Sequence, residues 1–148
     1  MEICLFQPEI AGNVGTIIRT AVCFGIKQIH IIMPTGFPFN TKELKRASMD
    51  YEQNITLTQH DSFESFIIKN TDKRIVLLTT KTNKSHTDFS YHNNDILMFG
   101  SESRGVNEEV TKKIDCKLKI LISPNARSLN VAISCGIVLA EAKRQLNF

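Results

Sequence analysis

The chain has 148 residues, of which 42% are hydrophobic and 22% are charged, a composition typical of a soluble globular protein. We expect residues 1–148 to form a single domain. No apolar run approaches the ~20 residues that span a bilayer. The net charge of +3 is compatible with an anionic partner but does not by itself indicate nucleic-acid binding. The four cysteines are scattered, without a C-x-x-C pair, which predicts a reduced cytoplasmic protein with no metal site.

The first half of the chain alternates strand and helix patterns. Residues 3–6 form a short apolar run, which predicts a strand. A helix is expected from Asn13, a good N-cap, to Gly25, a good stop signal. Residues 29–33 predict a second strand, which Pro34 ends. A basic helix over 41–48 and a strand over 55–58 follow. The apolar stripe of the first helix comprises Val14, Ile17, Ile18, Ala21 and Val22.

The second half continues the alternation. Asp61-Ser62-Phe63-Glu64 resembles a capping box and predicts a helix that runs to Lys69. Strands alternating with helices predict an α/β fold with a mainly parallel sheet and helices on both faces. The remaining expected elements are strands over 75–78, 96–99 and 118–122, and helices over 107–114 and 130–146.

The helix expected over 130–146 has little polar surface in its first half. A helix that is apolar on nearly all sides is buried on nearly all sides. In a chain this small, the pattern favours a subunit interface in addition to a core. The alternative is a helix enclosed within a monomer.

Three turns between a strand and a helix concentrate small and polar residues. They lie in residues 8–19, 99–105 and 123–130. Ligands of α/β proteins bind at such turns, so the pattern indicates a ligand site. The usual fingerprints of dinucleotide and phosphate loops are missing, and so is the G-x-S-x-G motif of serine hydrolases.

These segments resemble the three motifs of the SpoU branch of the SPOUT methyltransferases. The motif residues are Asn13-Val14-Gly15-Thr16-Ile17-Ile18-Arg19, Phe99-Gly100-Ser101-Glu102-Ser103-Arg104-Gly105 and Arg127-Ser128-Leu129-Asn130. Residues 8–10, 46–51, 78–81 and 141–145 resemble more narrowly the small single-domain tRNA (cytidine/uridine-2′-O)-methyltransferases of that family. The resemblance extends from Met1 almost to Phe148.

The resemblance implies a fold and a cofactor that the pattern of elements does not supply. Members of the family have a deep trefoil knot in the C-terminal part of the chain and work as homodimers. Three loops of the knot hold S-adenosyl-L-methionine in a bent shape. The implied cofactor-binding residues are Leu78, Gly100, Ile120 and Ser128. For Gly100 there is also a physical reason, since a missing side chain lets the backbone approach a ligand.

The implied catalytic residues are Arg19, Asn130 and Glu102. In the family, the arginine that matches Arg19 reaches the active site of the partner subunit. A guanidinium is essentially never deprotonated, so we expect it to orient the ribose 2′-hydroxyl and to stabilise developing alkoxide charge. The plain alternative is a solvated arginine on a polar helix face. Glu102 could anchor loop donors, lie near the sulfonium or cap a helix or loop, and Asn130 could cap the terminal helix.

Basic residues predict an RNA surface. Lys42, Lys45 and Arg46 would share one helical face, and Lys81 follows a strand. Arg104 could contact RNA phosphate or pair with Glu102. Each of these cations could also be merely solvated, but together they could bind an anticodon stem-loop.

The third motif departs from the family pattern. An Ile-Pro pair is usual there, whereas this chain has Ile120-Leu121-Ile122 and then Pro124. Ser101 also replaces a proline that is common in close relatives. The resemblance as a whole implies an S-adenosyl-L-methionine-dependent tRNA 2′-O-methyltransferase that acts on the wobble nucleotide of leucine tRNAs. The alternatives are another tRNA or rRNA position, or a catalytically silent RNA-binding dimer.

Overall fold

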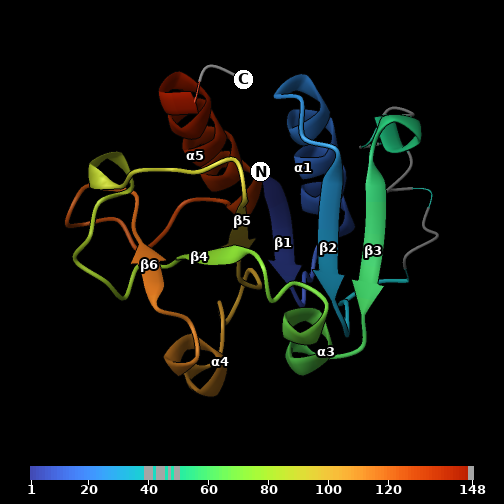
Figure 1. The fold of residues 1–148 in the computed structure, drawn as a ribbon, viewed down its shortest axis with the longest axis horizontal. Coiled ribbons are helices and arrows are strands. Elements are labelled where there is room, and N and C mark those ends of the chain that lie inside the picture. The colour runs from blue at the N-terminus through green and yellow to red at the C-terminus, as the bar shows by residue number, and fades with distance from the viewer. Residues whose placement is uncertain (39–41, 43–45, 47, 49–50, 147–148) are drawn as a thin grey trace.

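The core of the protein is a six-stranded sheet whose strands are all parallel (Figure 1). A computed structural model describes residues 1–38, 42, 46, 48 and 51–146. The strand order is β3-β2-β1-β5-β4-β6. The strands are β1 (Glu2–Phe6), β2 (Gln28–Ile32), β3 (Thr56–His60), β4 (Arg74–Leu78), β5 (Asp95–Phe99) and β6 (Cys116–Leu118).

The strand order reverses direction between β1 and β5. From β1 the chain adds β2 and β3 on one side, and later places β4, β5 and β6 on the other. The register pairs Glu2 with Ile96 and Leu5 with Phe99. The loops that follow β1 and β5 therefore leave the sheet next to each other. Such a reversal point opens a crevice at the carboxyl ends of the strands.

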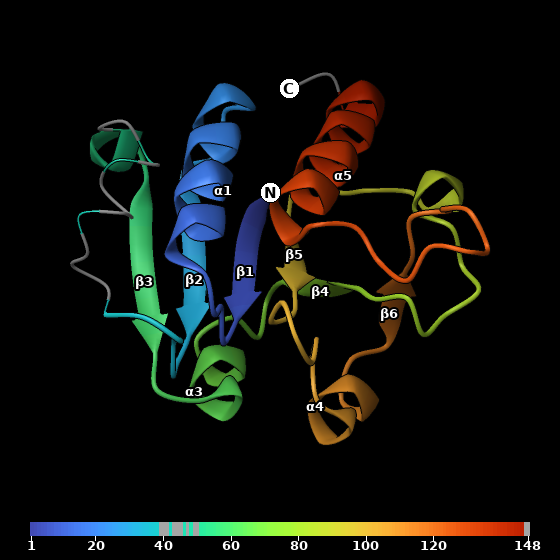
Figure 2. The same cartoon turned by 180° about the vertical axis from the view of Figure 1, so that it is seen from behind.

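Helices cover both faces of the sheet, as expected. One face packs against α1 (Ala11–Cys23) and α5 (Val131–Leu146), which lie side by side (Figure 2). The other face packs against α3 (Phe63–Ile68) and α4 (Glu108–Lys112). Alternate residues of β1 enter the two cores, because successive side chains of a strand point to opposite faces. Short 3₁₀ helices lie at Tyr51–Asn54 and His86–Asp88.

The start of α1 differs from the expectation. The N-cap is Ile10, which makes no side-chain cap hydrogen bond, and Asn13 lies inside the first turn. The expected N-cap role of Asn13 is therefore wrong. A carboxylate from a distant loop, that of Glu102, accepts the backbone N–H of Ile10 instead. Gly25 ends the helix as expected, with a left-handed φ of 78°.

Two further boundaries are also corrected. The capping box of α3 is formed by Ser62 and Ser65, one residue later than the expected Asp61 and Glu64. The last strand ends at Leu118 rather than at residue 122, because β4 ends at Leu78 and offers no further partner. Beyond it, only Lys119 forms an isolated bridge, with Ser85.

Three other expectations concern the basic helix, the knot and membrane-spanning helices. Of the predicted basic helix over 41–48, residues 42, 46 and 48 are helical, and the others lie outside the described residues. The C-terminal knot stays a prediction. Within the described ranges, no helix is both long and apolar enough to cross a bilayer.

Candidate active site

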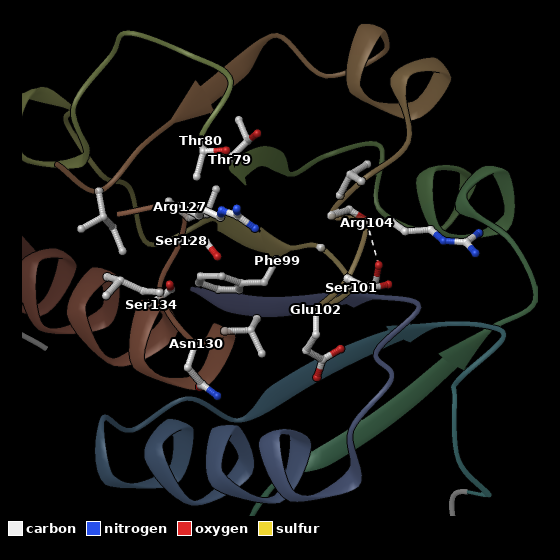
Figure 3. A pocket seen from close by; sticks show the side chains of 18 of the residues that line it. Thr79, Thr80, Phe99, Ser101, Glu102, Arg104, Arg127, Ser128, Asn130 and Ser134 are labelled. Carbon is white, nitrogen blue, oxygen red and sulfur yellow. Dashed lines mark hydrogen bonds between the residues drawn. The ribbon is translucent and has the colours of Figure 1, made fainter. Parts of the chain in front are cut away.

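A cavity of about 550 Å³ lies at the carboxyl ends of β4 and β5 (Figure 3). Its lining comes from four places in the chain: the start of α1, the loops that follow β4 and β5, and residues 120–134. All four predicted cofactor-binding residues line it, namely Leu78, Gly100, Ile120 and Ser128. Asn130 and Glu102 line it as well. The cavity therefore brings together predicted site residues that lie up to 52 positions apart in the sequence.

A closed turn after β5 forms one wall of the cavity. The backbone N–H groups of Ser101 and Gly105 each donate to the carbonyl oxygen of the other, at 3.2 and 2.9 Å. Gly105 has a left-handed φ of 69°. The turn folds back so tightly that a Cβ on Gly100 would lie 2.5 Å from the carbonyl carbon of Gly105. A glycine at position 100 is thus required by the turn itself, before any ligand is considered.

Glu102 uses both carboxylate oxygens to hold the start of α1. Its Oε2 accepts the N–H of Glu9 at 2.8 Å, and its Oε1 accepts the N–H of Ile10 at 3.3 Å. Asn13 Nδ2 also donates to Oε1, at 2.9 Å. Figure 3 shows this side chain pointing toward α1. A negative charge there also interacts favourably with the helix dipole. Of the roles expected for Glu102, the geometry supports the anchoring of loop donors.

Asn130 connects this network to α5. Its Oδ1 accepts the N–H groups of Ala132 at 2.8 Å and Ile133 at 3.3 Å, which confirms the expected capping role. Its Nδ2 donates to Asn13 Oδ1 at 2.9 Å. Hydrogen bonds therefore run in series from Glu102 through Asn13 to the first turn of α5. All three sequence motifs take part in this series.

The lining fits a ligand that combines apolar and polar parts. Phe99, Ile122 and Val131 provide apolar surface, and Thr79 and Ser134 provide hydroxyl groups. Residues at the ends of β4 and β5 line the cavity beside them. The volume falls within the range of small-molecule and cofactor sites. S-adenosyl-L-methionine, with an aromatic base, a ribose and a zwitterionic amino-acid end, matches such a mixed lining. Among the described residues, no group of three His, Cys, Asp or Glu side chains could hold a metal ion.

Three cations and one acid line the cavity. The cations are Lys81, Arg104 and Arg127, and the acid is Glu102. Figure 3 shows the side chain of Arg104 extending away from the cavity toward α3. The ion pairs found among the described residues include none between Arg104 and Glu102, so the pairing considered as an alternative is not formed.

The other predicted RNA-binding residues lie elsewhere. Lys42 and Arg46 are exposed and helical, whereas Lys45 lies outside the described residues. Arg19 is exposed on α1 and does not line the cavity. It lies six residues after Asn13, which corresponds to about 9 Å along the helix axis. The cavity of a single chain therefore forms without this guanidinium.

The sequence interpretation missed several residues of the site. Arg127 and Ser134 line the cavity, and Glu9 holds the turn after β5 from outside it. Arg127 belongs to a quoted motif and could have been selected by its charge. Glu9 gave only a weak signal, because an acid before a helix is readily explained by the helix dipole.

Comparison with known proteins identifies the family. Residues 1–140 match the model of the SpoU rRNA Methylase family. The chain belongs to the SpoU methylase family. A relative from Beijerinckia indica, a tRNA (cytidine(34)-2′-O)-methyltransferase, is 42% identical over 97% of this chain and 91% of its own length.

Solved structures of SpoU relatives agree with the fold. One, which concerns the 2-OH methylation of C/U34 on tRNA, superposes with a TM-score of 0.93 at 37% identity. That comparison covers 99% of this chain and 95% of the other. An AdoMet-bound rRNA methyltransferase from Sinorhizobium meliloti gives a TM-score of 0.89 at 29% identity, over 98% of this chain and 56% of that one. The SpoU resemblance expected from the motifs is confirmed.

Proposed function

We propose that this chain transfers a methyl group from S-adenosyl-L-methionine to the ribose 2′-oxygen of nucleotide 34 of a tRNA. The observation that carries the proposal is the cavity at the sheet's reversal point, where all three SpoU motifs meet. The names of full-length relatives support the substrate and the position. We also propose that residues 1–148 form a single domain. As a tRNA-modifying enzyme, the protein would act in the cytoplasm. Leucine tRNAs are the substrates that we propose.

The chemistry proposed for this site is a direct displacement. The cofactor supplies an electrophilic methyl group on a sulfonium. The backbone at Leu78, Gly100 and Ile120 and the hydroxyl of Ser128 would bind and orient the cofactor. Glu102 and Asn130 would hold the cavity walls in place, since Glu102 already bonds to the loop before α1 and Asn130 to the first turn of α5. The protein's contribution is then mainly the alignment of the reacting atoms.

The residue that we propose to act on the ribose is Arg19, supplied by a second copy of the chain. The exposed side chains of Ile10, Leu129 and Ile133 lie at the starts of α1 and α5 and support a homodimer through this side of the molecule. Across such an interface, the guanidinium of Arg19 would orient the 2′-hydroxyl and stabilise the developing alkoxide. The C-terminal trefoil knot is part of the same proposal. It is supported by the contact of residues 118–119 with the loop after β4.

The cations on the cavity rim support tRNA binding. Lys81, Arg104 and Arg127 would contact phosphates near the modified nucleotide. Lys42, Lys45 and Arg46 would extend this surface along the anticodon stem-loop. Phosphate contacts make binding sensitive to salt, so tRNA affinity should fall steeply as ionic strength rises.

The test is methyl transfer from labelled S-adenosyl-L-methionine to tRNA that lacks ribose methylation, followed by mapping of the label. Label on the 2′-oxygen of nucleotide 34 of leucine tRNA is the expected result. Label at another tRNA or rRNA position would support the proposed reaction and contradict the proposed substrate. A purified protein that does not bind the cofactor would reject the enzyme in favour of a silent RNA-binding dimer.

The role of Arg19 is tested by Arg19→Ala. The variant should bind S-adenosyl-L-methionine with wild-type affinity, because the side chain does not line the cavity. Its methylation rate should fall about 100-fold or more, the usual cost of losing one stabilising donor. Isothermal titration calorimetry and single-turnover methylation measure the two effects. A wild-type rate would show that the assigned role is wrong while the enzyme class stands.

A further inference from the structure

Two loops beside the cavity hold each other through a pair of carboxylates. Glu9, in the loop between β1 and α1, accepts the N–H of Ser103 at 3.0 Å and its hydroxyl at 2.6 Å. In return, Glu102 accepts the N–H of Glu9 at 2.8 Å. The partners are 93 and 94 positions apart in the sequence. These hydrogen bonds span the point between β1 and β5 at which the strand order reverses.

The backbone of Glu9 is also fixed from the opposite side. The N–H of Gly36 donates to the carbonyl oxygen of Pro8 at 2.9 Å. A Cβ on Gly36 would lie 2.8 Å from both the Cα and the carbonyl oxygen of Glu9. The loop after β2 is thus packed directly against this residue. With its backbone held at two points, the Glu9 side chain is a fixed support for Ser103.

The shape and the orientation of the turn after β5 have different causes. Its shape is internal, because Ser101 and Gly105 bond to each other and the backbone of Gly105 packs closely against Gly100. Its orientation depends on contacts with other parts of the molecule. Glu9 supplies those of Ser103, an exposed residue of the turn. All residues of the turn from Gly100 to Val106 line the cavity, but Glu9 does not.

We propose that Glu9 is a positioning residue, which sets the orientation of the turn over residues 101–105 and thereby the affinity for S-adenosyl-L-methionine. The ligand part of this inference rests on the proposed function. The carboxylate acts through Ser103 and does not line the cavity. Its two hydrogen bonds join the loop before α1 to the second motif from outside the cavity.

The test compares Glu9→Ala with the wild type in two measurements. Amide hydrogen exchange should become faster in residues 101–106, because the turn loses its support. The dissociation constant of S-adenosyl-L-methionine should rise about tenfold, the effect expected from the loss of a hydrogen bond to a charged group. The KM for the cofactor should rise in parallel. Glu108→Ala, which removes an exposed carboxylate on α4, is the matched control and should change neither measurement.

A conservative variant separates positioning from general stability. In Glu9→Gln, the amide oxygen can accept the N–H of Ser103 and the amide nitrogen can donate to its hydroxyl, since a serine hydroxyl both donates and accepts. This variant should recover most of the cofactor affinity. Ser103→Ala should weaken binding in the wild type but add little to Glu9→Ala, because both changes break the same contact.

Two results would overturn the inference. One is wild-type exchange in residues 101–106 of Glu9→Ala. The other is a lower melting temperature with no change in cofactor affinity or KM, which would indicate a merely structural residue. A wild-type protein that binds no S-adenosyl-L-methionine would refute the proposed function, and the exchange measurement would still decide whether Glu9 orients the turn.

Discussion

At the scale of single residues, Gly100 has a structural role that comes before any contact with a ligand. The backbone of Gly105 and Val106 occupies the position that a Cβ at residue 100 would need, with atoms 2.5–2.6 Å away. Backbone atoms cannot move aside as the end of a flexible side chain can. The glycine therefore fixes the turn that forms the cavity wall.

Gly100→Ala should destabilise the protein by about 1–3 kcal/mol, the usual cost of overpacking, and should abolish cofactor binding. Urea unfolding and calorimetry measure the two effects. Gly136→Ala is the matched control, since its Cβ would meet only the Thr20 methyl carbon, at 3.8 Å. Inside α5 this change should stabilise the helix by up to ~1 kcal/mol. Equal stabilities of the two variants would show that the turn can rearrange around a side chain.

Residues also differ in how well their roles could be predicted from the sequence. The capping role of Asn130 follows from a local pattern, and the structure confirms it. The role of Asn13 could not be predicted in the same way, because its partners Glu102 and Asn130 come from distant parts of the chain. Local patterns predict hydrogen bonds within one turn. They do not contain the tertiary contacts that decide which acceptor a helix end uses.

At the scale of elements, the last turn of α5 is tied to the rest of the molecule by polar side chains. Gln145 donates to the carbonyl oxygen of Phe89 at 3.0 Å and accepts the N–H of Tyr91 at 3.2 Å. Glu141 accepts hydrogen bonds from Gln145 and Arg144. The hydrogen bond from Arg144 and, to a smaller extent, the one from Gln145 lower the pKa of Glu141 to about 2. These contacts hold the end of the helix against the loop before β5.

A lowered pKa in the folded state means that ionised Glu141 stabilises the fold above its ordinary pKa of 4.5. This contribution should be lost as the pH falls from 4.5 toward 2. Glu141→Gln should therefore be less stable than the wild type at pH 7, by about 1 kcal/mol or less, because the partner Arg144 is exposed to solvent. The difference should shrink at pH 3, as measured by urea unfolding at both pH values. Glu108→Gln, at an exposed ion pair on α4, should show little difference at either pH. A difference for Glu141→Gln that is independent of pH would rule out its ionisation as the cause.

Among the elements, the sequence predicted every strand and each α-helix with defined bounds, and its errors lie at their ends. The expected strand over 118–122 begins two residues too late and ends four residues too late, since β6 spans Cys116–Leu118. The apolar residues Ile120 and Ile122 continue the strand pattern, but they line the cavity instead. A short apolar run has the same appearance whether a sheet or a cavity buries it. Pairing with β4 decides the boundary, and pairing is a property of the assembled sheet.

At the scale of the whole molecule, the proposed homodimer makes a prediction that no single chain can satisfy. Arg19→Ala leaves the cavity intact, whereas Gly100→Ala alters the cavity and leaves Arg19 in place. Each variant alone should be inactive. Co-expressed, they should form mixed dimers in which one of the two sites receives both parts, and about a quarter of the wild-type activity should return. Methylation by the whole co-expressed mixture measures this, because about half of its dimers would be mixed and each mixed dimer would have one working site of two. A mixture no more active than its parents would exclude a shared site.

The layered α/β architecture was predicted from the alternation of elements, but the strand order was not. Sequence periodicity shows which segments are strands and says little about which strands are neighbours. The order β3-β2-β1-β5-β4-β6 depends on where the second half of the chain returns to the sheet. The cavity residues were predicted from the family resemblance, because relatives share the way in which the second half of the chain joins the sheet.

The placement of β5 beside β1 has a consequence for how the protein is made. The first strand to leave the ribosome pairs on one edge with β2, but its other neighbour starts at Asp95. Until then, the edge of β1 has no strand to pair with, and an open apolar edge promotes aggregation. Pairing between residues so far apart also slows folding. We therefore expect the nascent chain to depend on chaperones until β5 has been synthesised.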